Sequence, residues 1–356
     1  MKKCYLLVAV FCVMSISGLD RAQSPAVKSA VVKLDPTLDE IVSPNAELQM
    51  VKSGFGFTEG LTWVQHGKIG YLLFSDIPAN VVDKMMPDST VSVFVDQSGY
   101  RGPWNGYTME NAGHLQNNGK DPKDPLYRQF NMIGSDGLTL DPQGRLLICT
   151  FSGRSLDRIE KDGKRLVLAD RFEGKRLNGP NDVVVKKDGA IYFTDTFSWR
   201  LREKDPSTEL PYQAVYMIKN GKMTLAIKDD DPSPNGLAFS PDEKYLYVTA
   251  PGATIRRYDV QPDDTVTNGK LLIDLSVDKS APGAPDGMRV DSRGNIYTPG
   301  PGGVWIISPE GKHLGTVLMP ERFANLSFGD ADYKTLYIGG RTSIYKIQVN
   351  VPGNHY

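Results

Sequence analysis

Six short polar segments of the chain each place a carboxylate or a carboxamide directly before an apolar run. The residues concerned are Glu59, Asp136, Asn181, Asp182, Asn235, Asp286 and Asn325. Their hard oxygen donors suit Ca²⁺ or another divalent cation of that kind, and no His or Cys belongs to the set. Zn²⁺ is disfavoured because it prefers nitrogen and sulfur ligands. These residue types could therefore bind a cation, and a carboxylate among them could transfer a proton.

Each segment also has a simpler interpretation, because Asn, Asp and Gly are common turn residues. The stretch Arg176–Val185, for example, begins as a polar turn and continues into the apolar run Val183–Val185. Taken alone, it predicts a turn before a strand. Four such residues at one position of a repeat, two of them acidic, instead favour a metal site with the ligands Glu59, Asn181, Asn235 and Asp286.

The elements that would position these residues repeat along the chain. A turn rich in Asp, Gly or Pro is followed by a short strand with β-branched or aromatic residues, roughly every 40–55 residues. Six copies occur, at Tyr71–Asp76, Leu146–Thr150, Ala190–Thr194, Tyr245–Thr249, Asn295–Thr298 and Thr335–Gly339. This period predicts an all-β fold, a six-bladed β-propeller, over residues 51–350. A β-sandwich would not explain the regular repeat.

A closed ring of blades would bring the first residue of each innermost strand to the central axis. Because the polar residues all precede or begin such strands, we expect them to converge there. Residues 25–50 are Pro-containing without a sustained period and predict an extended lead-in. The polar segment 100–130 interrupts the repeat, and Trp104, Tyr107 and Tyr127 suggest a lid over the axial site.

Composition and the N-terminus limit the classes of function. The 356 residues are 40% hydrophobic and carry a net charge of −1, so no basic field for nucleic acid or an acidic membrane is evident. Lys2 and Lys3 precede the short apolar run Tyr5–Ile16, which predicts a signal peptide over residues 1–24. We therefore expect an exported protein, periplasmic or secreted, with no membrane association after signal removal. Its one remaining thiol, Cys149, is expected to be buried.

The motifs Glu59-Gly60, Asn178–Asp182, Ser233–Gly236 and Pro285–Met288 resemble those of the gluconolactonase/regucalcin (senescence marker protein) family, especially its exported bacterial gluconolactonase-like members. The resemblance runs from about residue 50 to 348. It implies a six-bladed propeller with one catalytic divalent ion, held by the residues matching the family's ligands.

Those ligands carry over to Glu59, Asn235 and Asp286, while the position of Asn181 is a ligand in related calcium propellers and contacts substrate in others. Asn178 stands where some members have a substrate-binding Arg, and Cys149–Ser152 replaces a Glu-His pair of many bacterial members. The candidates for substrate binding are Asn178, Asn181, Asp136 and Asn325.

The resemblance predicts a Ca²⁺-dependent hydrolase, with another divalent ion as an alternative, that opens a small-molecule lactone such as gluconolactone. Asp286 or Asp182 would be the general base that activates water. Two alternatives remain at this stage: a phosphotriesterase or other esterase on the same metal site, and a non-catalytic ligand-binding propeller. We expect a monomer or a weak oligomer.

Overall fold

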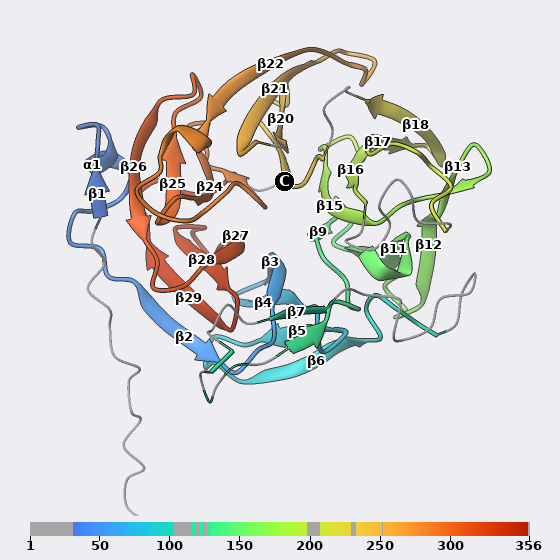
Figure 1. The fold of residues 1–356 in the computed structure, drawn as a ribbon, viewed down its shortest axis with the longest axis horizontal. Helices are drawn as coiled ribbons and strands as arrows, with labels where there is room; N and C mark the ends of the chain where they lie inside the picture. The colour runs from blue at the N-terminus through green and yellow to red at the C-terminus, as the bar shows by residue number, and fades with distance from the viewer. Residues whose placement is uncertain are drawn as a thin grey trace, which may run out of the picture.

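Most of the described strands belong to six antiparallel sheets, which surround a central axis as the blades of a β-propeller (Figure 1). The computed structural model describes residues 31–102, 115–117, 122, 123, 125, 127, 129–197, 207–228, 233–250 and 252–354. Four blades follow the chain in order from the innermost strand outwards, and the last two are completed by N-terminal strands. The predicted fold class is confirmed.

The first four blades are each built from four consecutive strands. Blade one contains β3 (Thr58–His66), β4 (Ile69–Asp76), β5 (Val81–Met85) and β6 (Val91–Asp96). Blade two contains β9 (Leu138–Leu140), β10 (Leu146–Cys149), β11 (Leu156–Ile159) and β12 (Arg165–Ala169). Blade three contains β15 (Pro180–Val185), β16 (Ile191–Asp195), β17 (Ala214–Lys219) and β18 (Lys222–Ile227). Blade four contains β19 (Leu237–Phe239), β20 (Tyr245–Ala250), β21 (Thr254–Val260) and β22 (Val266–Asp274).

The N-terminal segment completes the outer edges of blades five and six. Blade five consists of β23 (Arg289–Val290), β24 (Ile296–Gly300), β25 (Gly303–Ile307), β26 (His313–Leu318) and the outermost β1 (Val31–Lys33). Blade six consists of β27 (Phe323–Gly329), β28 (Thr335–Gly340), β29 (Ser343–Gln348) and the outermost β2 (Gln49–Ser53). The short helix α1 (Leu38–Ile41) connects β1 to β2. The lead-in anticipated for residues 25–50 thus joins the propeller, where it is described, and pairing of β2 with β29 closes the ring.

Apolar residues of neighbouring blades form the core between them. The Lys187-Asp188-Gly189 turn joins β15 to β16, with Gly189 at a φ of 89° that favours glycine. Val183 of β15 and Phe193 of β16 are fully buried, and they cluster with Leu147 of the preceding blade. Cys149 lies in the same cluster with no exposed surface, which confirms its predicted burial. Apolar contacts with the preceding blade therefore hold β15 and β16 in place.

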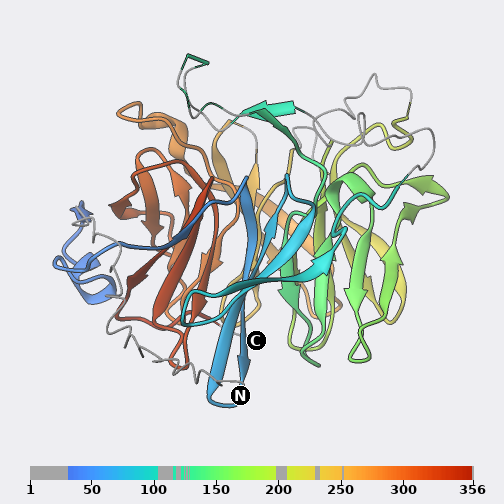
Figure 2. The ribbon, with the colours of Figure 1, turned by 90° about the horizontal axis from the view of Figure 1, so that it is seen from below.

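The insertion at residues 100–130 leaves the ring from the end of blade one. The Gly134 N–H donates to the Ile77 carbonyl at 2.8 Å, which holds the end of the insertion beside the end of β4. Its described part includes the pair β7 (Leu115–Asn117) and β8 (Gln129–Asn131), which lies above one face of the blades (Figure 2). Trp104 and Tyr107 fall outside the described residues, so the lid stays a prediction.

The remaining short elements lie in loops. They are the pair β13 (Arg171–Phe172) and β14 (Lys175–Arg176) and the 3₁₀ turns η1 (Phe151–Gly153) and η2 (Leu275–Val277). Over the portion of the chain that the structure describes, none of the helices has the length and apolar character needed to cross a bilayer.

Candidate active site

The polar residues singled out in the sequence lie at the same end of the six innermost strands. Glu59, Asn181, Asp182 and Asn325 are among the first three residues of β3, β15 and β27. Asp136, Asn235 and Asp286 precede β9, β19 and β23 by two or three residues. In Figure 1 the inner strands β3, β9, β15 and β27 surround the axis. The ring therefore gathers at one face the residues that the repeat predicted to converge, with Asn178 as an exception described below.

Irregularities in strand pairing orient three of these side chains. The register of β3 with β4 shifts between Glu59 and Thr62, and that of β15 with β16 shifts between Pro180 and Val183. A third shift lies between Phe323 and Asn325 in β27. Such bulges bend a strand and change the direction of its side chains, and they are common beside functional sites. Regular pairing resumes after each shift, where the strand enters the apolar core.

The glycines beside the polar residues allow neighbouring blades to approach closely. A Cβ on Gly137 would lie 2.5 Å from Asp182 Oδ1, and a Cβ on Gly287 would lie 2.4 Å from Asn325 Nδ2. Neither glycine has the positive φ that would mark a glycine-dependent turn. Glycine is needed at both positions because a side chain would not fit there. The simple turn interpretation of these Asp-Gly pairs is therefore incomplete.

Six of the seven side chains form three carboxylate–carboxamide pairs, each between adjacent blades. Asn181 Nδ2 donates to Asp136 Oδ2 at 2.8 Å. The side chain of Asn325 is hydrogen-bonded to Glu59, and that of Asn235 to Asp286. Each pair leaves its carboxylate with further acceptor capacity, because an ionised carboxylate has about four lone-pair positions.

Asp182 is the carboxylate outside these pairs. Its Oδ1 accepts the Val183 N–H at 2.8 Å, and the side chain also accepts the Leu237 backbone N–H. Its Oδ2 is buried and has no hydrogen-bond partner among the described residues. A buried acceptor without a partner is costly, so an unpaired carboxylate oxygen at this face indicates a ligand position.

Burial raises the pKa values of all four carboxyl groups, and repulsion by neighbouring carboxylates adds to the effect for Glu59, Asp136 and Asp286. Burial, followed by the charges of Asp286 and Asp136, raises the pKa of Glu59 well above its usual range. Burial and the charge of Asp286 do the same for the pKa of Asp136. Burial raises the pKa of Asp182 to about 6, and burial with the charge of Asp182 raises the pKa of Asp286 to about 7. Four carboxyl groups that interact in this way can all be ionised at once only if a positive charge lies near them.

These donors fit the divalent cation that the sequence suggested. The buried carboxylate of Glu59 and the half-buried, hard-oxygen side chains of Asn235 and Asp286 supply suitable donors around the axis. In the described ranges, no three His, Cys, Asp or Glu side chains form a metal-binding group on their own. The proposed shell instead mixes carboxylates with amides, which is within the habit of Ca²⁺ sites.

Asn178 lies apart from the carboxylate–carboxamide pairs. Its side-chain Nδ2 donates to the Tyr212 carbonyl at 2.8 Å, and its backbone N–H donates to Asp195 Oδ2 at 2.9 Å. The side chain is fully buried, and its Oδ1 has no hydrogen-bond partner in the described parts of the chain. A role in substrate binding stays a prediction for this residue.

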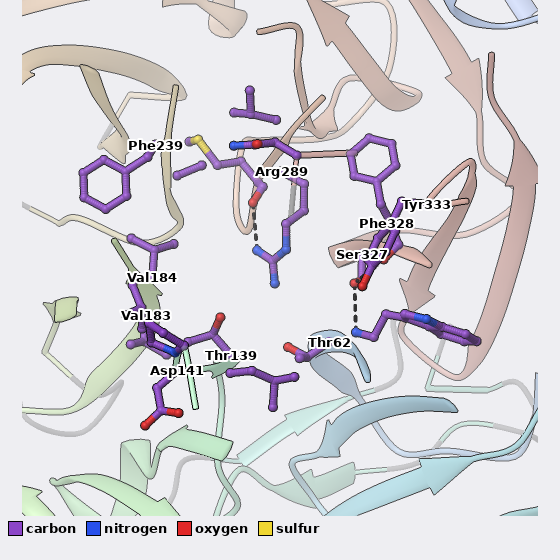
Figure 3. Close-up of a pocket in the computed structure, with 18 of the residues that line it drawn as sticks. Thr62, Thr139, Asp141, Val183, Val184, Phe239, Arg289, Ser327, Phe328 and Tyr333 are labelled. Carbon is purple, nitrogen blue, oxygen red and sulfur yellow. Dashed lines mark hydrogen bonds between the residues drawn. The ribbon is translucent and has the colours of Figure 1, made fainter. Parts of the chain in front are cut away.

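Arg289 is the charged residue at the axis that the sequence interpretation missed. It follows Met288 at the start of β23, and it interacts electrostatically with Asp182 and Glu59. Figure 3 shows its side chain reaching into the cavity between the inner strands. The available signal was an arginine in a strand whose counterparts in the other blades are apolar or small at that depth.

Comparison with known proteins places the chain among lactonases. It is 31% identical over 335 residues to a gluconolactonase of Zymomonas mobilis, covering 91% of this chain and 87% of the relative. It is 30% identical over 256 residues to a 6-deoxy-6-sulfogluconolactonase of Pseudomonas putida, covering 65% of this chain and 83% of the relative.

Solved structures show the same fold. A gluconolactonase of Xanthomonas campestris superposes with a TM-score of 0.72 at 26% identity, covering 92% of this chain and 98% of the other. The sequence profile of the SMP-30/Gluconolactonase/LRE-like region matches residues 57–342, which include all the paired carboxylates and amides. The chain belongs to the SMP-30/gluconolactonase family.

Proposed function

We propose that the protein is an exported lactonase that depends on a divalent cation, with Ca²⁺ as the first choice and a sugar lactone such as gluconolactone as the substrate. Relatives that match about nine-tenths of the chain bear the names of lactone-hydrolysing enzymes. The observation that carries the proposal is the set of carboxylate–carboxamide pairs around the unpartnered Asp182 Oδ2.

Glu59, Asn235 and Asp286 would hold the cation, with Asn181 as a further donor. They come from four different blades, so the closed ring fixes their positions before any ligand arrives. When bound, the cation supplies Lewis acidity for the lactone carbonyl. Asp136 is hydrogen-bonded to Asn181 and Asn325 to Glu59, so these two residues would orient two of the cation's donors.

The proton of the attacking water would be taken by a carboxylate of the chain. Asp182 is the stronger candidate for this base, because its Oδ2 is unpartnered in the described structure. Asp286 is bonded to Asn235, which suits a ligand better than a base. The pKa of Asp182 is about 6 before any cation binds, close to the range in which general bases are most effective. In this assignment Asp182 moves the proton and Asp286 binds.

The test is a set of pH-stat assays with glucono-δ-lactone, an aliphatic lactone and a phosphotriester, each with and without EDTA. We expect hydrolysis of the sugar lactone, its loss in EDTA and its recovery on addition of Ca²⁺. Activity only on the phosphotriester would favour the esterase alternative. No activity on any substrate, with Ca²⁺ still bound, would favour a ligand-binding propeller and would contradict the proposal.

A further inference from the structure

Arg289 spans the central channel from blade five to blade one. Its Nη1 donates to the Met288 carbonyl at 2.8 Å, and its Nη2 donates to the Leu61 carbonyl at 2.9 Å. Blade six lies between these two blades in the ring, so the second bond reaches past a whole blade. The planar guanidinium is thus fixed in direction by carbonyls on two sides of the channel.

The guanidinium separates the candidate site from a second space at the other end of the channel. A cavity of about 290 Å³ is lined by Arg289 and by inner-strand residues that include Thr62, Val184, Phe239 and Ser327 (Figure 3). Each of these lies further along its strand than the polar residue of the site, and none of the seven site residues lines the cavity. Arg289 therefore stands between the acidic face and the opposite face.

Arg289 is also the positively charged residue with the strongest electrostatic effect on the buried carboxylate of Asp182. Its charge is the main influence that lowers the pKa of Asp182 against the effect of burial. Asp182 and Glu59 in turn favour its charged form against the cost of burial. A second cation, Arg322, acts on Asp286 from an exposed loop, where water screens it. Within the channel, Arg289 therefore supplies the positive charge that offsets the negative charge of these carboxylates.

A fixed cation beside a cation-binding site has two opposite effects. It stabilises the site when no ion is bound, because it offsets repulsion between carboxylates. It weakens the binding of a divalent cation, because like charges repel strongly in a medium of low dielectric. Both effects fall with distance, and hydrogen bonds to two carbonyls hold the guanidinium of Arg289 where it is.

We propose that Arg289 is a built-in counter-cation, which stabilises the ion-free acidic cluster and sets a moderate, exchangeable affinity for the divalent cation. This inference rests on the proposed function where it concerns the bound ion. It makes Arg289 a positioning residue, which acts on the site through Glu59 and Asp182 and touches no substrate. It also explains why an arginine occupies an inner strand whose other side chains here are apolar or small.

The first test is calorimetric titration of Ca²⁺ into wild type, Arg289→Gln and Arg289→Lys. Gln can keep a donor towards the Leu61 carbonyl but removes the charge, so we expect tighter binding, by roughly fivefold to a hundredfold. Lys keeps the charge and should bind close to wild type. A purely structural role predicts the reverse for Gln, since a disordered site binds more weakly. Weaker or unchanged binding by Arg289→Gln would overturn the proposal.

Arg293→Gln is the matched control for the loss of one positive charge. Arg293 lies in the same blade and forms an exposed ion pair with Glu40. Its removal should leave the Ca²⁺ affinity unchanged, because solvent screens exposed charges. An equal gain of affinity in Arg293→Gln would show that net charge, and no special place of Arg289, controls binding.

A second test needs no metal. Thermal unfolding in EDTA is compared for wild type, Arg289→Gln, Asp182→Asn and the double variant. We expect Arg289→Gln to lower Tm clearly when Asp182 is present, and by much less when it is introduced together with Asp182→Asn. Equal losses in both backgrounds would refute the counter-cation. A wild type that binds no divalent ion would refute the metal in the proposed function, while this cycle would still decide the role of Arg289.

Discussion

Thr194 donates a hydrogen bond from its Oγ1 to the carbonyl oxygen of Asn235 at 2.8 Å, which joins blade three to blade four beside the candidate site. Thr194 Oγ1 also accepts a hydrogen bond from the backbone N–H of Asp182 at 2.9 Å. Equivalent hydroxyls recur: Ser75 Oγ donates to the Asp136 carbonyl at 2.8 Å, and Thr249 Oγ1 to the Asp286 carbonyl at 3.2 Å. Hydroxyls at or near the ends of second strands thus hold the site residues of the next blade.

Replacing Thr194 by Val should show the value of this link. The change keeps the shape but leaves the Asp182 N–H and the Asn235 carbonyl without their partner, at a cost of about 1–3 kcal/mol in stability. Activity should fall as well, because two site residues are released at once. Thr194→Ser keeps the hydroxyl and should stay close to wild type. Urea unfolding and lactonase rates check both, and a stable, fully active Thr194→Val would contradict the link.

Gly137→Ala tests the close approach of blades two and three. The new Cβ would lie 2.6 Å from the Asn181 carbonyl oxygen and 2.6 Å from Asp182 Cα, so the backbone would have to shift. We expect a loss of about 1–3 kcal/mol in stability, typical of overpacking, and a large fall in kcat. Gly163→Ala is the control: Gly163 has a φ of 81° with open space around it, so it should lose stability without loss of activity.

The sequence predicted the propeller well because its signals are local and repeated. Turn residues, aromatic strands and a constant spacing mark each blade, and the second strands of all six blades lie where the repeat indicated. The place of the polar residues at one end of the inner strands followed from ring closure alone. The outer strands of blades five and six were harder, because β1 and β2 pair with segments some 300 residues away and leave little local pattern.

The finer chemistry of the site depends on contacts between blades, which a local pattern does not carry. The pairing of Asp136 with Asn181 and the bridge from Thr194 to Asn235 join residues that are 45 and 41 positions apart. Arg289 looked like an ordinary strand residue, and its partner Leu61 lies 228 positions away. Asn178 shared a motif with Asn181, yet its side chain turns to Tyr212, because the bulge at Pro180–Val183 separates the two directions.

The stability of the protein should depend on pH through Asp83 of blade one. Burial, with the charge of Asp76, raises the pKa of Asp83 to about 6. Its pKa is thus higher in the folded than in the unfolded chain, so its stabilising protonation is complete below about pH 4 and is lost as the pH rises through 6. Asp83→Asn removes this loss and should be more stable than wild type at pH 8, by up to about 3 kcal/mol.

The comparison below about pH 4 is the control for Asp83→Asn, since position 83 is then largely neutral in both proteins, in the folded and in the unfolded state. Urea unfolding at the two pH values gives the difference directly. A gain of stability that is equal at both would show that Asp83 does not titrate as described.

Export is tested at the N-terminus, which lies outside the described residues. The basic pair Lys2-Lys3 and the apolar run Tyr5–Ile16 predict cleavage so that the mature chain begins between residues 17 and 26. Mass spectrometry of the protein from a cell envelope or culture fraction should find a peptide that starts there. An intact Met1 in the folded, active protein would show that the segment is not removed.

Substitutions at three site residues should distinguish binding of the ion from transfer of the proton. The residues are Asp286, Asn235 and Asp182. Asp286→Asn removes a charge from the proposed shell, so it should weaken Ca²⁺ binding and reduce kcat together. Asn235→Asp places a second carboxylate against Asp286, to which Asn235 is now hydrogen-bonded. It should keep the ion, lose the donor that orients Asp286 and lower activity. Asp182→Asn should keep the ion as well.

For Asp182→Asn the loss should fall on kcat, by a factor of about 10²–10⁴, which is the usual contribution of a general base. Its backbone contacts with Val183 and Thr194 remain possible, so the fold should be retained. Calorimetric Ca²⁺ titration of each variant, paired with lactonase rates at saturating Ca²⁺, distinguishes the two roles. If Asp286→Asn lost kcat while it bound Ca²⁺ normally, and Asp182→Asn lost the ion, the roles would be exchanged. Full activity in both variants would remove both carboxylates from the mechanism, because neither a lost ligand nor a lost base is compatible with an unchanged rate.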